Sequence, residues 1–336
     1  MELRNNTGKD WDERSVLLTG ANGFVGGWLA AALVNAGARV VAIVRNDLPH
    51  GGLRIHGVDE RVESVRGDVL DQTLVERVLV DHEVSVVYHL AAQSLVGHAN
   101  RMPASTFATN TMGTVAMLEA CRLANVKHVV LASSDKAYGA SPRLPYKEND
   151  PLLGGAPYET SKALAEGAAR SYATTYGIRI ATARCANIYG PGDLNFSRLI
   201  PDTIRAVLAG RSAKLRSDGT PRRDYLFASD AAQAYMTLGS YCLNTMKDGA
   251  YEPFNFGWGQ PVSALEMVTL ISELAGRPDL VPEVLGTTTT EIQDQYLESQ
   301  HARDELGWTP EIELRAGLKT AINWYRQRLY PAREER

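Results

Sequence analysis

The chain has 336 residues, of which 44% are hydrophobic and 22% are charged, and this composition excludes an intrinsically disordered protein. Its formal net charge of -4 argues against nucleic acid as the main partner, because proteins that bind a phosphate backbone normally carry a basic excess. The three cysteines, Cys121, Cys185 and Cys242, form no CxxC pair, and no spacing of His, Asp and Glu suggests a metal, so neither a disulfide framework nor a metal site is predicted.

The amino-terminal segment, Met1 to Arg14, is polar and charged and lacks the apolar core of a signal peptide. No run of eighteen apolar residues occurs in the sequence, so no membrane-spanning helix is predicted. We therefore expect a cytoplasmic protein that does not associate with a membrane.

From Ser15 to about Cys185, short apolar runs alternate with stretches that have a helical pattern. Several runs are continuous in Val, Ile, Leu and Ala, as strands covered on both faces should be. The predicted strands are 15–19, 39–44, 62–65, 84–88, 128–132 and 178–183, and the predicted helices are 24–36, 103–124 and 157–176. This order predicts an α/β fold, a doubly wound parallel sheet (Rossmann), over residues 15–186.

After residue 186 the sequence changes to longer loops rich in Gly and Pro, followed by helical runs at 263–275 and 313–329. We interpret residues 187–330 mainly as a smaller C-terminal α/β substrate-binding lobe, with some chain returning to the Rossmann sheet.

A glycine motif follows the first predicted strand and opens the first predicted helix. Glycines at such a turn allow backbone to approach a pyrophosphate, and the helix amino terminus supplies N–H donors and a favourable dipole. The motif therefore predicts a dinucleotide site whose contacts include Gly20, Asn22, Gly23, Phe24, Val25 and Gly26.

The end of the second strand is where this fold recognises the adenosine ribose, and an acid there selects NAD whereas an Arg accommodates NADP. Arg45 comes first and favours NADP, but Asp47 follows closely, so the cofactor is expected to be NADP or NAD. Asp68 and Val69, after the third strand, are placed to contact the adenine, although Asp68 is equally well explained as a turn or helix-cap residue.

Tyr158 and Lys162 lie four residues apart on a predicted helix and therefore share one face. A nearby ammonium lowers the pKa of a phenol, so the tyrosinate can act as a base on an alcohol. Ser134 stands at the carboxyl end of the fifth strand, the edge at which open α/β sheets bind ligands. These residues predict oxidation of an alcohol by the dinucleotide.

Segments along nearly the whole chain resemble the extended short-chain dehydrogenases/reductases of the NAD-dependent epimerase/dehydratase family, which act on nucleotide sugars. The resemblance is carried by the glycine motif, His89-Leu-Ala-Ala-Gln93, Asn110-Thr-Met-Gly-Thr114, Tyr158 with Lys162, Asn187-Ile-Tyr-Gly-Pro-Gly192, Arg223-Asp-Tyr-Leu-Phe227 with Asp230, and Leu306-Gly-Trp-Thr-Pro310. It implies cofactor contacts at Leu90, Ala91, Ala92 and Asn110, and a homodimer formed through the helices that begin at Pro103 and Pro157. His89 is more simply a structural histidine.

Ser134-Asp135-Lys136 looks like the motif of CDP-glucose 4,6-dehydratases, whereas 4-epimerases usually have small residues after the hydroxyl residue. The resemblance implies a lyase in which Asp135 protonates the departing C6 hydroxyl and Lys136 removes the C5 proton or, if charged, stabilises the C4 enolate. The alternatives are a nucleotide-sugar 4-epimerase, which needs neither residue, and, more remotely, a non-catalytic dinucleotide-sensing regulator.

The nucleotide-sugar substrate is expected to contact Gln93, Asn187, Arg198, Leu199 and Arg223, with the Arg223 guanidinium on the diphosphate. Arg222 is the competing choice, and Asn187 is equally well explained as a turn residue. The segments Gly190-Pro-Gly-Asp193 and Arg223-Asp224 have the general family form rather than the CDP-glucose form, so the nucleotide base and the hexose stay open.

Overall fold

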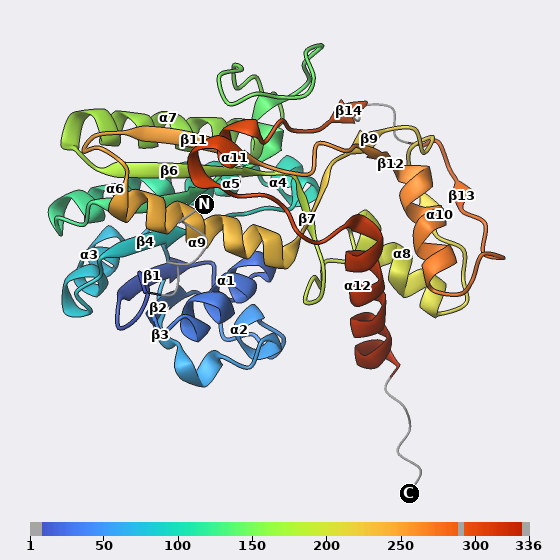
Figure 1. Cartoon of the computed structure of the whole chain (residues 1–336), viewed down its shortest axis with the longest axis horizontal. Helices are drawn as coiled ribbons and strands as arrows, with labels where there is room; N and C mark the ends of the chain where they lie inside the picture. Colours follow the sequence, from blue (N-terminus) through green and yellow to red (C-terminus); the bar gives the residue numbers. More distant parts are fainter. Residues whose placement is uncertain (1–8, 288–291, 331–336) are drawn as a thin grey trace, which may run out of the picture.

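A computed structural model describes residues 9–287 and 292–330, and part of the polar amino-terminal segment used above lies outside these residues (Figure 1). Seven strands form one sheet in the order β11-β6-β5-β4-β1-β2-β3, and every neighbouring pair is parallel. The strands are β1 (Ser15–Thr19), β2 (Arg39–Val44), β3 (Glu63–Arg66), β4 (Val86–His89), β5 (His128–Ala132), β6 (Arg179–Cys185) and β11 (Tyr251–Phe256). The order reverses between β1 and β4, which is the switch point where such sheets bind ligands.

Helices cover both faces of this sheet because side chains of each strand alternate between two cores. On β1, Val16 and Leu18 pack into one core and Leu17 into the other. The first core is closed by α1 (Phe24–Asn35) and α9 (Ala228–Asn244), and the second by α3 (Gln72–Asp81), α6 (Gly113–Leu123) and α7 (Pro157–Tyr176). The predicted doubly wound α/β fold is confirmed.

The prediction of one continuous helix from Pro103 to Ala124 is wrong. The segment consists of α5 (Pro103–Phe107), a π-helical turn (Ala108–Met112) and α6. Asn110 lies in this turn and is 1% exposed, and its side chain is bonded to Gln93 and Ser161. Single π turns inside helices are frequent at functional sites, and hydrophobic periodicity does not reveal them.

The chain between Gly190 and Ser263 is more regular than the loops that the sequence predicted. It contains α9, which packs on α1, and β11, which pairs with β6 at the edge of the sheet. Pro253 interrupts the β11 pattern, but an edge strand tolerates a residue without an N–H donor. The division of the chain at residues 186 and 187 stays a prediction, since α9 and β11 belong to the sheet.

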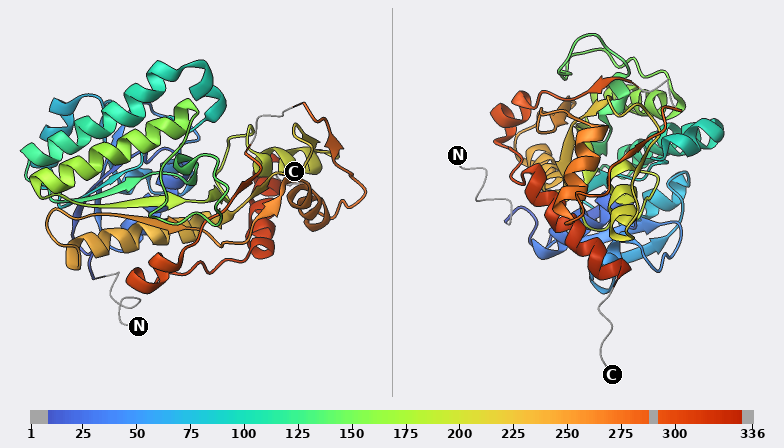
Figure 2. Two further views of the ribbon diagram at one scale, coloured as in Figure 1. Left: turned by 90° about the horizontal axis from the view of Figure 1, so that it is seen from above. Right: turned by 90° about the vertical axis from the view of Figure 1, so that its right-hand side faces the viewer.

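A smaller lobe lies beyond one end of the sheet, as the left view in Figure 2 shows. Its core lies among α8 (Leu199–Leu208), α10 (Ala264–Leu274) and α12 (Leu314–Leu329), and includes Ile204, Met267 and Ile322. The short strands near it are β7 (Asn187–Tyr189), β8 (Lys214–Leu215), β9 (Arg222–Arg223), β10 (Tyr225–Phe227), β12 (Val262–Ser263), β13 (Glu283–Val284) and β14 (Asp294–Gln295). The remaining helices are α2 (Gly52–Ile55), α4 (Val96–Arg101) and α11 (Gln300–Leu306).

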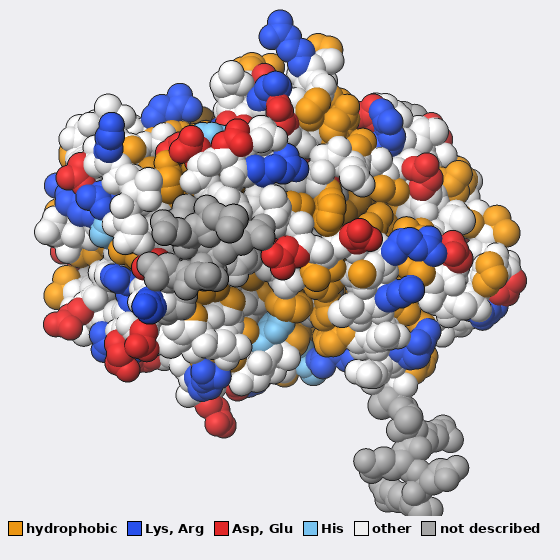
Figure 3. All heavy atoms as spheres, in the orientation of Figure 1, with side chains coloured by type: hydrophobic (Ala, Val, Ile, Leu, Met, Phe, Trp, Pro, Cys, Tyr) orange, Lys and Arg blue, Asp and Glu red, His pale blue; other side chains and the backbone are white. Residues whose placement is uncertain are grey.

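The surface of one face is shown in Figure 3, where hydrophobic side chains gather in the middle of the view, between the sheet and the smaller lobe. Among the described residues, no helix is both long and apolar enough to span a membrane.

Asp230, in the first turn of α9, joins this helix to the segment that leads into α12. Its Oδ2 atom accepts hydrogen bonds from the backbone N–H groups of Glu311, at 3.1 Å, and Ile312, at 3.0 Å. Its carbonyl accepts a bond from the indole N–H of Trp308. Burial raises the pKa of Asp230, so the ionised carboxyl carries a desolvation cost that the two N–H donors offset.

We expect Asp230→Ala to lower the free energy of unfolding by about 2 kcal/mol, because two buried N–H groups lose their acceptor. Asp230→Asn should cost less than about 1 kcal/mol, since one amide oxygen can accept both bonds without a buried charge. Urea denaturation followed by circular dichroism measures both values. Equal losses in the two variants would contradict the hydrogen-bonding role.

Candidate active site

The glycine motif after β1 is built for close backbone approach. Gly20 has φ +78°, and a Cβ atom there would lie 2.8 Å from the carbonyl carbon of Leu90. A Cβ atom on Gly26 would lie 2.1 Å from the Gly20 carbonyl oxygen. Neither position admits a side chain. The backbone after β1 therefore lies close to both α1 and the loop at Leu90, as a dinucleotide fold requires.

The amino terminus of α1 fits an anionic group. No side chain caps this helix, whose N-cap residue is Gly23 and whose first residues are Phe24 and Val25, and its first turn holds no acidic residue. Asn22 is turned away, because its side-chain amide donates to the carbonyl of Asn46 at 3.2 Å. Backbone N–H groups at such a terminus are suited to a pyrophosphate.

The expected adenosine contacts lie together at the ends of β2 and β3. Arg45 Nη1 and Asp68 Oδ2 are 3.9 Å apart, and both side chains are exposed. Asp68 also accepts a bond from the backbone N–H of Leu70, as a turn residue does. Asp47 is 3.1 Å from the guanidinium of Arg54, and Val69 packs against Gly113.

The loop after β4 is held by Thr19. Its hydroxyl accepts a bond from the backbone N–H of Ala91 and lies 3.0 Å from His89 Nδ1. Burial lowers the pKa of His89 to about 3, so its ring is neutral, and its structural role stays a prediction. This arrangement places Leu90 and Ala91 beside Gly20 of the glycine motif, and Ala92 follows them in the chain.

Gln93 and Asn110 are locked to each other at the same edge. The Asn110 side chain accepts a bond from the backbone N–H of Gln93, at 2.7 Å, and donates to its carbonyl at 3.1 Å. It also donates to the hydroxyl of Ser161, which joins the π-helical turn to α7.

Tyr158 and Lys162 project from α7 toward the end of β5. Lys162 Nζ donates to the carbonyl of Ala132 at 2.7 Å. Burial lowers the pKa of Lys162 to about 8, and the nearby Glu166 carboxylate acts in the opposite direction. Burial raises the pKa of Tyr158 to about 12, which a hydrogen bond with Ser134 partly offsets. Loss of hydration therefore sets the direction of the shift, and the predicted lowering of the phenol pKa by Lys162 stays a prediction.

Ser134, Asp135 and Lys136 begin a tight 3-10 turn (Asp135–Tyr138) directly after β5. The Ser134 hydroxyl accepts a bond from the Lys136 backbone N–H and donates to Asp135 Oδ1 at 3.0 Å. Lys136 Nζ lies 3.8 Å from Asp135 Oδ1 and donates to Asn187 Oδ1 at 3.3 Å. Asp135 Oδ2 is buried and accepts no hydrogen bond from the described residues.

The predicted diphosphate arginines come from the smaller lobe. Arg198 precedes Leu199 at the start of α8, forms an ion pair with Asp193 at 3.2 Å, and lies close enough to lower the pKa of Tyr158. The Arg223 guanidinium donates to the carbonyls of Arg222 and Gln293. Arg222 is bound by Asp294 through two hydrogen bonds of 2.9 and 2.8 Å, so its fork is already engaged.

Two further polar residues at this site were missed. Asp224 is 0% exposed and accepts bonds from the backbone N–H groups of Trp258 and Gly259. Burial raises its pKa to about 6, and the charge of Asp135 adds to this rise. Gln295 is 3% exposed, stands opposite Arg223 in the β9–β14 register, and has a side-chain nitrogen without a hydrogen-bond partner. Asp224 lies inside a recognised motif, but no sequence signal marks Gln295.

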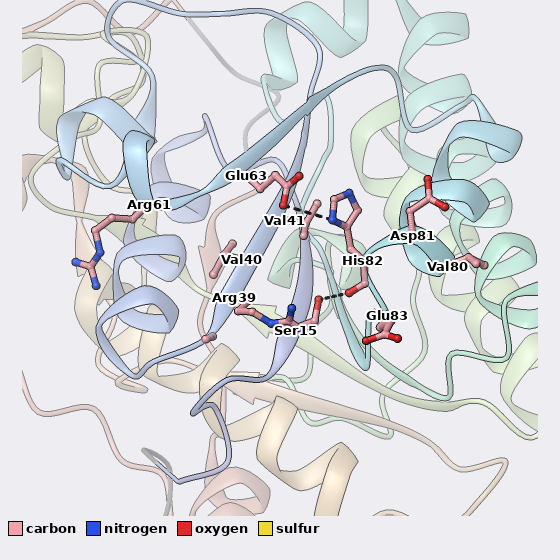
Figure 4. Close-up of a pocket in the computed structure, with 11 residues that line it drawn as sticks. Ser15, Arg39, Val40, Val41, Arg61, Glu63, Val80, Asp81, His82 and Glu83 are labelled. Carbon is pink, nitrogen blue, oxygen red and sulfur yellow. Dashed lines mark hydrogen bonds and ion pairs between the residues drawn. The ribbon is translucent and has the colours of Figure 1, made fainter.

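A hollow lies at the opposite edge of the sheet, near the amino ends of β1 and β2 (Figure 4). His82 is 3.4 Å from Glu63, and the Ser15 hydroxyl donates to the His82 carbonyl. These contacts join secondary-structure elements at the edge away from the switch point, so we place the active site at the carboxyl ends of β1, β4, β5 and β6.

The chain is similar to known proteins over most of its length. The model of the NAD dependent epimerase/dehydratase family matches residues 16–252. A UDP-glucose 4-epimerase from Mycolicibacterium smegmatis is 32% identical, covering 93% of this chain and 98% of that protein. A dTDP-glucose 4,6-dehydratase from Xanthomonas campestris pv. campestris is 30% identical, covering 92% of each chain. The structure of a dTDP-glucose 4,6-dehydratase from Streptomyces venezuelae, solved with NAD bound, superposes with a TM-score of 0.84 at 27% identity, covering 93% of this chain and 97% of that one.

Proposed function

The chain belongs to the NAD dependent epimerase/dehydratase family, and on this premise we propose that it is a nucleotide-sugar 4,6-dehydratase. The reaction converts an NDP-hexose into the NDP-4-keto-6-deoxyhexose. The observation that carries the proposal is the position of Asp135 and Lys136, which follow Ser134 at the end of β5, near Tyr158. A 4-epimerase needs neither residue.

The residues present fit a nicotinamide dinucleotide. Gly20, Gly23 and Gly26 make the turn and leave the amino terminus of α1 free of a side-chain cap, and Leu90 lies against Gly20. When bound, the cofactor supplies a hydride acceptor at C4 and later a hydride donor at C6. The family is described as NAD dependent. The preference for NADP that Arg45 favours stays a prediction.

Tyr158 would take the proton of the C4 hydroxyl as that carbon is oxidised. Its pKa of about 12 means that the free phenol holds its own proton at neutral pH. A positive charge near the phenol favours the tyrosinate, and Lys162, one helical turn after Tyr158 on α7, would supply it. The hydrogen bond with Ser134 orients the phenol and provides a second route for the proton.

Asp135 and Lys136 would carry out the elimination that follows. A ketone at C4 acidifies the C5–H bond, so Lys136 can remove that proton while Asp135 gives a proton to the C6 hydroxyl, which leaves as water. The unpartnered Oδ2 of Asp135 is free to meet this hydroxyl. Lys136 acts as the base when neutral, and as a stabiliser of the C4 enolate when charged.

Arg198 and Arg223 would bind the diphosphate. Arg198 enters the site from the start of α8, near Tyr158, and Arg223 enters from β9. Arg222 is the weaker choice because Asp294 already occupies its fork. Gln93 and Asn187 line the same edge, and Gln295 has an N–H group available for a sugar hydroxyl.

The alternative is a nucleotide-sugar 4-epimerase, which the M. smegmatis relative favours. An epimerase would use Ser134, Tyr158 and the cofactor for oxidation and re-reduction at C4. It would leave the buried Asp135 oxygen without a role in the reaction.

The oligomeric state is part of the proposal. We expect a homodimer through the outer faces of α6 and α7, where Leu123 on α6 and Leu164 on α7 are about half exposed, as is Met112 in the π-helical turn between α5 and α6. The predicted cytoplasmic location stays a prediction.

The proposed function is tested by incubating the protein with a panel of nucleotide hexoses in deuterated water and following the products by mass spectrometry. We expect the product to have lost one water and to have gained one solvent deuterium at C5, because C5 is deprotonated during elimination. A C4 epimer of unchanged mass as the product would contradict the dehydratase proposal and support a 4-epimerase.

Lys136→Ala is expected to lower the rate of water loss by a factor of about 100 or more, because elimination loses its base or its enolate stabiliser. C4 oxidation should continue and appear as transient reduced cofactor absorbing at 340 nm. Lys147→Ala, which breaks a surface pair with Glu298, is the control and should eliminate water at the original rate. An unimpaired Lys136→Ala enzyme would remove this residue from the mechanism.

A further inference from the structure

A buried ion pair lies next to the Ser134–Lys136 segment, which we call the catalytic segment. Glu166 is 0% exposed and Arg184 is 1% exposed, and they are joined by hydrogen bonds from Nη2, at 2.7 Å, and Nε, at 3.0 Å. Glu166 lies one helical turn after Lys162 on α7, and Arg184 is on β6. Neither residue was singled out from the sequence.

The pair reaches the catalytic segment from both ends. The hydroxyl of Ser133, the residue before Ser134, donates to Glu166 Oε1 at 2.5 Å. Arg184 Nη1 donates to the hydroxyl of Tyr138, the last residue of the catalytic turn, at 2.7 Å, and its guanidinium also stacks over that ring at 4.8 Å. Ser134, Asp135 and Lys136 are therefore bracketed by two residues bonded to one ion pair.

The ion pair forms further hydrogen bonds with other parts of the chain. Arg184 also donates to the carbonyl of Glu148 at 2.9 Å, and Glu166 Oε2 accepts a bond from the hydroxyl of Tyr251, on β11, at 2.5 Å. Tyr138 in turn donates to Asn255 Oδ1, also on β11. A buried hydrogen-bonded network of this kind restrains the groups that it joins, and removing either Glu166 or Arg184 would leave a buried charge unpaired.

We propose that Glu166 and Arg184 form a positioning centre that fixes the Ser134–Lys136 segment against Tyr158 and Lys162, acting through Ser133 and Tyr138. The reaction that this segment performs rests on the proposed function, whereas its positioning by Glu166 and Arg184 does not. The same helix, α7, carries Tyr158, Lys162 and Glu166, so one rigid element sets both halves of the site. Glu166 and Arg184 touch no reacting atom and are positioning residues.

The structure offers matched variants for a test. Ser133→Ala and Tyr138→Phe each remove one hydroxyl that links the centre to the catalytic segment. Tyr251→Phe removes a hydrogen bond of equal length to the same Glu166 carboxylate. This bond comes from β11 and not from the catalytic segment. Ser133→Thr keeps the hydroxyl and serves as the conservative rescue.

Two measurements are made on the NAD-bound protein. The first is the rate of C4 oxidation with a nucleotide hexose, read as reduced cofactor at 340 nm, a half-reaction common to dehydratases and epimerases. We expect the single-turnover rate constant for cofactor reduction to fall about 10- to 100-fold in Ser133→Ala and Tyr138→Phe, because misplacement affects the reacting groups rather than the diphosphate site. The concentration of nucleotide hexose that gives half of the maximal rate should change less than about threefold. Ser133→Thr and Tyr251→Phe should stay within about twofold of the original enzyme.

The second measurement is amide hydrogen exchange of the peptide covering residues 133–139, which requires no turnover. Exchange should be faster in Ser133→Ala and Tyr138→Phe and unchanged in Tyr251→Phe, although all three variants lose a hydroxyl bond and a similar amount of thermal stability. Equal exchange in the three variants would overturn the positioning role. If no nucleotide sugar reduces the cofactor, the proposed function fails, and exchange alone decides for or against the positioning centre.

Discussion

The active-site edge depends on one physical constraint, which is that charges buried under the sheet must be partnered. Lys162 is bound by the carbonyl of Ala132, and Glu166 and Arg184 bind each other and three hydroxyl groups. These contacts join α7 to β5, β6 and β11. The hydrogen bonds that offset the desolvation cost of the buried charges therefore also fix the position of the Ser134–Lys136 segment.

Much of this edge could be predicted from the sequence. Continuous apolar strands, the glycine motif and the spacing of Tyr158 and Lys162 are local patterns with a single structural consequence, and the sheet and its switch point follow from them. The hydrogen bond between Ser134 and Tyr158 could also be predicted, because it needs only the end of β5 to face α7.

Other features depend on tertiary contacts that no local pattern records. The π-helical turn exists where the Asn110 side chain reaches Gln93 and Ser161. Gln295 reaches the site because β14 pairs with β9, more than 70 residues earlier in the chain. The pKa of Tyr158 depends on how completely the phenol is buried, which spacing does not reveal.

The unpartnered oxygen of Asp135 separates the two reactions most clearly in physical terms. A buried acceptor without a donor costs the folded protein about 1–3 kcal/mol, so packing alone gives no reason to keep a carboxylate there. A dehydratase needs such a group, because a hydroxyl that leaves as water must be protonated within a site that excludes solvent. An epimerase has no leaving group at C6 and would be served by a small side chain. The unpartnered oxygen therefore supports the proposed elimination, in which Asp135 would be the proton donor.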